Sequence, residues 1–199
     1  MQELMQVKLL LLFLSGILLA GIVSGAVIVT SLSQDQVHYI SQHVHSFFTE
    51  PATGSTIDLF KSSLSYYAKV ILIIWLCGIS ILGAPIIILI IFLKGLTLGF
   101  SIGFFVLDQG VQGFALALAA VFPQNVFVVP VLLILSTGAL FFTIRVCRHL
   151  LNKGYSTIHV YFRSYWMLFA GACVVCIVIS IYESTLSTYL VQAIFNQLS

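Results

Sequence analysis

Charged residues are scarce in this chain of 199 residues, since Asp, Glu, Lys and Arg together make up only 7% of it. Hydrophobic residues make up 60%, which a soluble domain would have to expose as large apolar patches. The eight basic and six acidic residues leave a formal charge of +2, too small and too scattered to indicate nucleic acid as a partner. The composition therefore predicts an all-α protein that crosses the lipid bilayer several times as one membrane domain, residues 1–199.

Signatures of catalysis and of cofactor binding are also missing from the sequence. It contains no G-x-x-x-x-G-K-S/T loop for phosphate and no H-E-x-x-H motif. Its four cysteines lie in or beside apolar runs, where a free thiol behaves as a small hydrophobe, so we expect neither a disulfide framework nor a zinc site. The histidines at positions 38, 43 and 45 match no zinc spacing. We therefore predict that the chain has no cofactor, binds no metal and is not an enzyme.

Apolar runs long enough to cross a hydrocarbon core of about 30 Å occur five times. The predicted spans are residues 9–30, 70–93, 95–120, 127–144 and 164–181. Residues 31–69 form the predicted outer loop. We interpret Pro85 as a kink inside the second span, because proline removes a backbone hydrogen bond from a helix interior.

The third span is ambiguous, because its first apolar run stops at Asp108 and a second run follows at 111–122. Either one helix crosses the membrane, or two half-helices enter and return. A crossing helix places six of the eight basic residues on one side, whereas a re-entrant one divides them. The positive-inside rule therefore favours the crossing, with a cytoplasmic amino terminus and a carboxyl terminus outside.

Two segments outside the spans show an apolar face at helical spacing. In the outer loop these residues are Val37, Ile40, Val44 and Phe47, and Ser33 and Gln36 are spaced as a capping box. We predict an amphipathic helix that lies on the membrane surface or against partner helices. A second amphipathic helix is expected after residue 183, either as an extension of the last span or at the interface.

Small residues at four-residue intervals predict close helix packing. They are Gly95, Gly99 and Gly103 in one segment, and Gly16, Ala20, Gly21 and Gly25 in the first span. Such a face lets another helix approach backbone to backbone. The neighbour is either a helix of the same chain or an interface with a second copy or another protein.

Polar residues at the predicted membrane boundaries complete the candidate set. Lys94 and Asp108 are expected near the two ends of the third span. Pro123, Gln124 and Asn125 are expected to form an ordered outer turn, in which the Asn125 amide bonds backbone ends. Asp108 also allows a different function, a small transporter or permease subunit with a path near this carboxylate.

The sequence resembles the stage II sporulation protein M family. The resemblance lies in residues 15–32, FLKG at 92–95, LGF at 98–100, GF at 103–104 and PQN at 123–125. It implies five spans and a scaffold of the mother-cell membrane, active during engulfment. Such a scaffold brings two peptidoglycan hydrolases, the stage II sporulation proteins D and P, to the septum.

Overall fold

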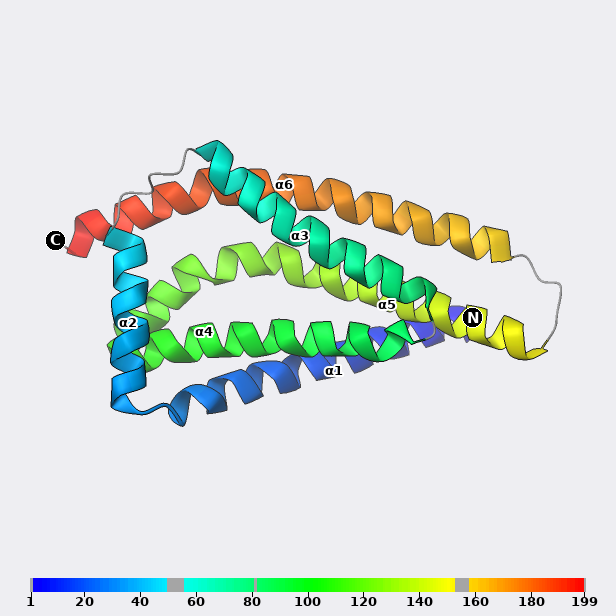
Figure 1. The fold of residues 1–199 in the computed structure, drawn as a ribbon, viewed down its shortest axis with the longest axis horizontal. Helices are drawn as coiled ribbons and strands as arrows, with labels where there is room; N and C mark the ends of the chain where they lie inside the picture. Colours follow the sequence, from blue (N-terminus) through cyan, green and yellow to red (C-terminus); the bar gives the residue numbers. More distant parts are fainter. Residues whose placement is uncertain (1, 50–55, 81, 153–157, 199) are drawn as a thin grey trace.

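The computed structural model describes residues 2–49, 56–80, 82–152 and 158–198. Within these ranges it contains six helices and no strand, which confirms the all-α prediction. The helices are α1 Gln2–Thr30, α2 Gln34–Thr49, α3 Thr56–Ile79, α4 Gly83–Ala120, α5 Phe122–Asn152 and α6 Ile158–Leu198. The carboxyl end is thus an extension of the last span rather than a separate helix (Figure 1).

Five helices are long and apolar enough to cross a membrane, which confirms the predicted number. The spans are Glu3–Thr30, Phe60–Ile79, Gly83–Asp108, Asn125–Arg148 and Phe162–Ile181. The central helix is α5, which packs on α1, α3, α4 and α6. On one side of it α1 pairs with α4, and on the other α3 packs against α6 (Figure 1). The short helix α2 runs crosswise over the end of the bundle opposite the amino terminus.

The predicted second span, 70–93, is wrong, because the chain turns in its middle. The Ser80 N–H donates to the Cys77 carbonyl at 3.1 Å, and the Gly83 N–H donates to the Ser80 carbonyl at 3.0 Å. Residues 60–69, assigned to the outer loop, belong instead to the span of α3. Pro85 is not a kink but the third residue of α4, where helix N–H groups have no partner and proline costs little.

The predicted third span, 95–120, is also wrong, because the crossing begins at Gly83 and ends at Asp108. Gly110 has φ 60° and ψ −131°, a backbone conformation that residues other than glycine rarely adopt. This residue breaks the helical path at the end of the bundle. Residues 111–120 then turn back as a helical arch that leads into α5 (Figure 1).

The α1–α4 pair is the tightest contact of the fold, and glycines make it. A Cβ on Gly99 would collide with the Ile22 carbonyl and lie 2.8 Å from Ile22 Cα. A Cβ on Gly25 would lie 2.7 Å from the Phe100 backbone nitrogen. Gly21 and Gly95 are equally close to the backbone of the opposite helix. Of the two readings of the glycine pattern, the structure shows contact within one chain at these four positions.

The other small residues of the pattern contribute less to this contact. Gly103 is at its edge, since a Cβ there would be 3.4 Å from Ala26 Cα, an ordinary distance. Gly16 and Ala20 are exposed, and a Cβ on Gly16 would meet nothing within 4 Å. Within the described residues, the predicted packing face at Gly16 and Ala20 is therefore not used for helix contact, because the α1–α4 crossing uses a different side of α1.

On the opposite side of α5, hydroxyl groups join three helices. Tyr165 on α6 donates a hydrogen bond to the Trp75 carbonyl on α3 at 2.9 Å, and its ring stacks on Phe142 of α5. Thr143 on α5 donates to the Gly78 carbonyl on α3 at 2.7 Å. Gly78 leaves room for the Tyr165 hydroxyl, which a Cβ would displace. The bundle is thus fastened by glycine packing on one side and by aromatic and hydroxyl contacts on the other.

We expect Gly99→Ala to destabilise the folded protein by about 1–3 kcal/mol, the usual cost of overpacking a tight contact. The new methyl group would push the backbones of α1 and α4 apart. Gly16→Ala is the matched control and should not lower stability, because its Cβ would meet nothing within 4 Å. Thermal or denaturant unfolding in detergent measures both variants. Equal stability of the two would contradict the assignment of Gly99 to this contact.

Candidate functional site

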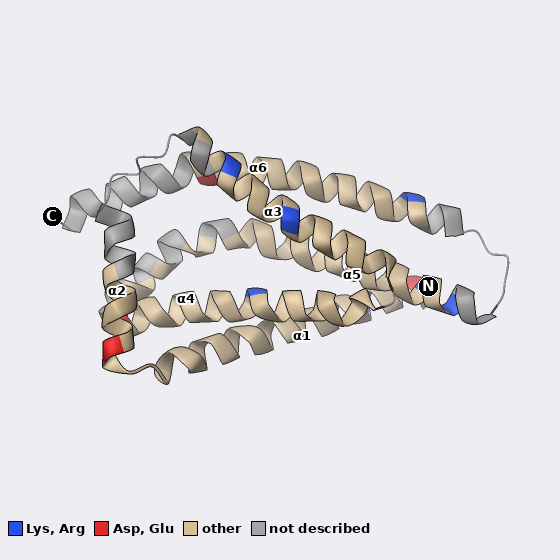
Figure 2. Cartoon of the chain, in the orientation of Figure 1, with Lys and Arg blue, Asp and Glu red and all other residues tan. Residues whose placement is uncertain are grey.

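The two ends of the bundle carry opposite charge among the described residues. The end with the amino terminus holds Lys8, Arg145, Arg148 and Arg163, with Glu3 bound to Arg145. The end with α2 holds Asp35, Asp108 and Glu183, with Lys61 as the basic residue (Figure 2). One end is therefore basic and the other is acidic.

The helix α2 is fixed at the acidic end by its own cap and by the bundle. The predicted capping box is confirmed: the Ser33 N–H donates to Gln36 Oε1 at 3.0 Å, and the Gln36 N–H donates to Ser33 Oγ at 3.4 Å. The Ser41 hydroxyl donates to Asp108 Oδ2 on α4 at 3.4 Å. Asp108 thus lies at the membrane boundary, as predicted, and joins α2 to the end of a span.

The apolar face predicted on α2 is only partly described. Val37 and Ile40 are half-buried, which is consistent with a face turned towards the bundle. The side chains of Val44 and Phe47 lie outside the described residues.

A shallow hollow of about 290 Å³ lies beside this face. It is lined by Leu32, Asp35, Gln36, Tyr39 and Ile40. Tyr39 is 64% exposed, so α2 presents a large aromatic ring at the acidic end of the bundle.

Lys94 does not lie at a membrane boundary, which corrects the prediction. It is near the middle of the span Gly83–Asp108, because that span begins eleven residues before it. Its side chain is partly buried, and the Glu183 carboxylate on α6 attracts its ammonium group. A charge at this depth is expensive unless it is paired or hydrated, and the attraction of the Glu183 carboxylate, just beyond the span of α6, partly offsets that cost.

Pro123, Gln124 and Asn125 form the first turn of α5 rather than a turn between helices. Proline near a helix start is favourable, because its missing N–H would have no partner there. The Asn125 amide donates to the Val121 carbonyl at 2.7 Å, so it bonds a backbone end as expected.

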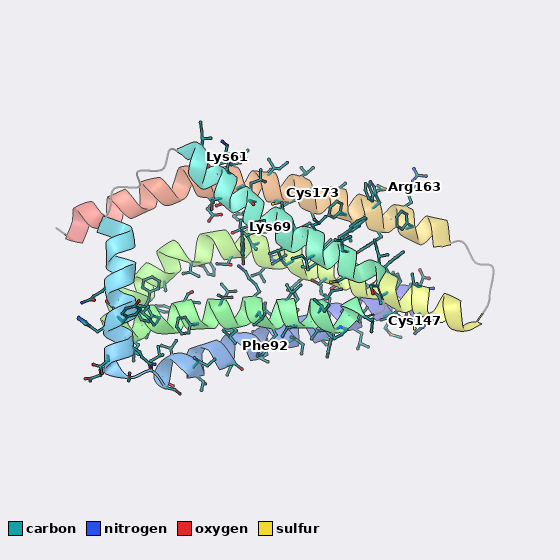
Figure 3. The ribbon with its side chains drawn as sticks, viewed as in Figure 1. Lys61, Lys69, Phe92, Cys147, Arg163 and Cys173 are labelled. Atoms are coloured by element: carbon teal, nitrogen blue, oxygen red, sulfur yellow. The ribbon has the colours of Figure 1, made fainter. Side chains whose placement is uncertain are left out.

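Chemically reactive side chains are not gathered into a site in the described part of the chain. Cys77, Cys147, Cys173 and Cys176 are free thiols, and Cys173 lies on α6 away from Cys147 (Figure 3). No three His, Cys, Asp or Glu side chains of the described residues come together as metal ligands. The arrangement that remains is an interfacial helix held across one end of a membrane bundle.

These features define the class of the protein, a polytopic α-helical membrane protein with an interfacial helix at one end. The chain belongs to the stage II sporulation protein M family, because the family model described as Stage II sporulation protein M matches residues 9–188. It is therefore a sporulation-related membrane protein. No curated protein and no solved structure matches the chain significantly.

We expect Asp108→Ala to loosen α2, because the Ser41 hydroxyl loses its acceptor on α4. A hydrogen bond of this kind contributes about 0.5–1.5 kcal/mol, which corresponds to roughly two- to tenfold faster amide exchange over residues 34–42. Hydrogen–deuterium exchange with mass spectrometry measures the effect. Lys61→Ala, at the same end but on α3, is the control and should leave exchange in α2 unchanged. Unchanged exchange in Asp108→Ala would show that this bond does not hold α2.

Proposed function

We propose that this protein is a non-catalytic scaffold that holds peptidoglycan-degrading enzymes at the septum during engulfment. Its membership of the stage II sporulation protein M family supports a role in sporulation. The observation that carries the scaffold role is α2, a helix fixed across one end of a five-span bundle with Tyr39 exposed. We propose the stage II sporulation proteins D and P as the enzymes it holds.

The orientation follows from the charge of the two ends. Lys8, Arg145, Arg148 and Arg163 share the end that holds the amino terminus. The positive-inside rule places such an end in the cytoplasm. The acidic end with α2 then faces outwards, and so does the carboxyl end of α6 after its span (Figure 1). This orientation brings α2 to the side of the membrane on which peptidoglycan lies.

The outer end suits a docking role better than a catalytic one. Residues 31–59, between the first two spans, are too few for a peptidase domain with its own core. The hollow beside α2 instead combines an exposed tyrosine with the carboxylate of Asp35. Tyrosine is among the residues that contribute most to protein–protein binding, because its ring is large and its hydroxyl is polar. A partner with an apolar and basic patch fits this surface.

The decisive experiment is affinity purification of the tagged full-length protein from sporulating cells, with co-purified proteins identified by mass spectrometry. We expect both wall hydrolases with the wild type and a loss of about tenfold or more with Tyr39→Ala, as for an aromatic hot spot. Tyr66→Ala is the matched control, since Tyr66 is an exposed tyrosine on α3. Absence of both hydrolases from the wild-type sample would refute the scaffold role. Equal recovery by the two variants would refute the docking surface only.

A transporter or permease subunit is the second candidate, and one observation favours it. Lys94 places a charge inside the bundle, and ionisable groups at membrane depth often mark an ion or substrate path. Asp108, the carboxylate that the sequence suggests for this role, is hydrogen-bonded to Ser41 at the end of its span. The candidate path therefore passes Lys94 rather than Asp108.

Removing both charges together separates these functions. We expect the double variant Lys94→Met with Glu183→Gln to stay folded, because it removes both the partly buried ammonium group and the carboxylate that attracts it. The scaffold role requires the double variant to retain both hydrolases and to support engulfment. A stable double variant that retains the hydrolases but blocks engulfment would favour a transport path.

A further inference from the structure

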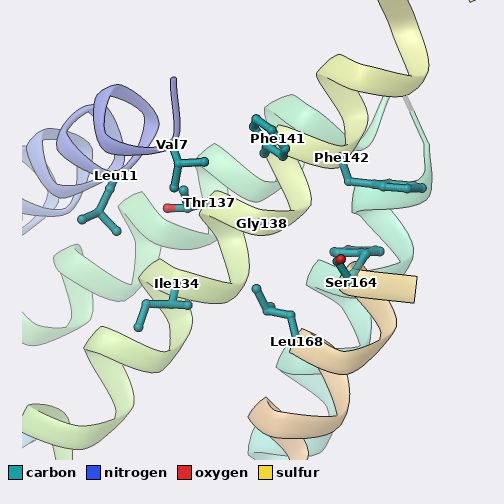
Figure 4. Close-up of a pocket in the computed structure, with 10 residues that line it drawn as sticks. Val7, Leu11, Ile134, Thr137, Gly138, Phe141, Phe142, Ser164 and Leu168 are labelled. Carbon is teal, nitrogen blue, oxygen red and sulfur yellow. The ribbon is translucent and has the colours of Figure 1, made fainter. Parts of the chain in front are cut away.

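A groove runs along α5 at the basic end of the bundle, between α1 and α6 (Figure 4). It has a volume of about 270 Å³. Val7 and Leu11 of α1 form one wall, Leu168 of α6 forms the other, and Ile134 and Phe141 of α5 lie between them. The groove exists because α1 and α6 each pack on α5 but make little contact with each other.

The groove presents mostly hydrocarbon, with the Ser164 hydroxyl on its α6 wall as one polar group of the lining (Figure 4). The Thr137 hydroxyl in its wall donates a hydrogen bond to the Leu133 carbonyl at 2.7 Å, inside α5. The Tyr165 hydroxyl donates a hydrogen bond to the Trp75 carbonyl of α3 at 2.9 Å. The hydroxyl groups of these two lining residues are therefore already used within the protein. A ligand that lies here gains packing contacts, and an alkyl chain is the ligand that this lining matches.

The mouth of the groove is cationic. Ile134, Gly138 and Phe141 recur at helical spacing on one face of α5, and the same spacing continues to Arg145 and Arg148. Arg145 lies over the Phe141 ring, 5.0 Å from its centroid, and is paired with Glu3.

Two further cations at this end add to the charge of Arg145. Lys8 directly follows Val7 on α1, and both Lys8 and Arg148 are exposed. The mouth therefore carries three cations and one carboxylate, that of Glu3, from α1 and α5.

The dimensions fit a lipid chain and exclude a helix. The α5 lining runs from Ile134 to Phe142, eight residues or about 12 Å along the helix, and Arg145 lies about one turn beyond it. Half of the hydrocarbon core is about 15 Å, so the groove and Arg145 together reach from near the membrane midplane to the headgroup level. A helix with its side chains is about 10–12 Å across and cannot enter a cavity of 270 Å³.

We propose that this groove binds one acyl chain of an anionic phospholipid, whose phosphate is held by Arg148 and Lys8. The apolar lining selects the chain, and the cations at the mouth select the negative headgroup. The site belongs to the basic end of the bundle, so it is separate from α2 and independent of hydrolase docking. An anionic lipid held there fills the gap between α1 and α6.

Native mass spectrometry of the purified full-length protein, with added phosphatidylglycerol or phosphatidylcholine, tests the headgroup. We expect the wild type to retain phosphatidylglycerol preferentially, and Arg148→Gln to reduce that preference about fivefold, the effect of about one surface cation. Arg163→Gln is the matched control. Arg163 is exposed at the same end but points away from the bundle on α6 (Figure 3). Equal retention of the two lipids by the wild type, or equal effects of the two variants, would overturn the proposal.

The same measurement with Ile134→Trp tests the groove. Ile134 is 55% exposed at the rim, so the larger ring can fill the groove without entering the core. We expect less retained phosphatidylglycerol, with unfolding temperature unchanged. Leu19→Trp, at a position on α1 that is 60% exposed and outside the groove, is the control and should retain lipid like the wild type. Wild-type retention by Ile134→Trp would mean that lipid binds elsewhere.

Discussion

The close approach of α1 and α4 is the constraint on which the rest of the fold depends. In lipid there is no hydrophobic force between helices, so association relies on van der Waals contact and on hydrogen bonds. Gly21 and Gly25 on one helix and Gly95 and Gly99 on the other let the two backbones touch. Once α4 is fixed on α1, the crossing places Lys94 at mid-membrane and Asp108 at the end of the bundle.

The position of α2 follows from the end of α4. The Asp108 carboxylate accepts a hydrogen bond from the Ser41 hydroxyl. Two residues later, Gly110 has a positive φ that turns the chain away from the axis of α4. The span therefore stops where α2 crosses the bundle, and the arch 111–120 leads into α5. A surface for partners at this end thus depends on the same glycine contact that holds the spans, although the contact lies inside the bundle.

The two ends of the molecule differ in charge, and the two proposals place a different role at each end. The basic end, with Arg145 and Arg148 on one stripe of α5, matches the anionic headgroups of a membrane surface. The acidic end lies on the opposite side (Figure 2). It carries α2, on which Tyr39 is exposed. The proposed scaffold role uses both properties, because such a protein must stay in the bilayer and still expose a recognition surface beyond it.

The sequence by itself determined the class, the number of spans, the capping box at Ser33 and the glycines of the α1–α4 contact. These depend on local composition and on helical spacing, which need no knowledge of neighbours.

Only the tertiary structure decided where the second and third spans begin and end. No charged residue lies near the turn at Ser80, so the sequence pattern predicts a single helix over the apolar run of 24 residues there. The depth of Lys94 and the meeting of Ser41 with Asp108, 67 residues apart in sequence, depend on which helices pack together. Spacing along one helix carries no information about that choice.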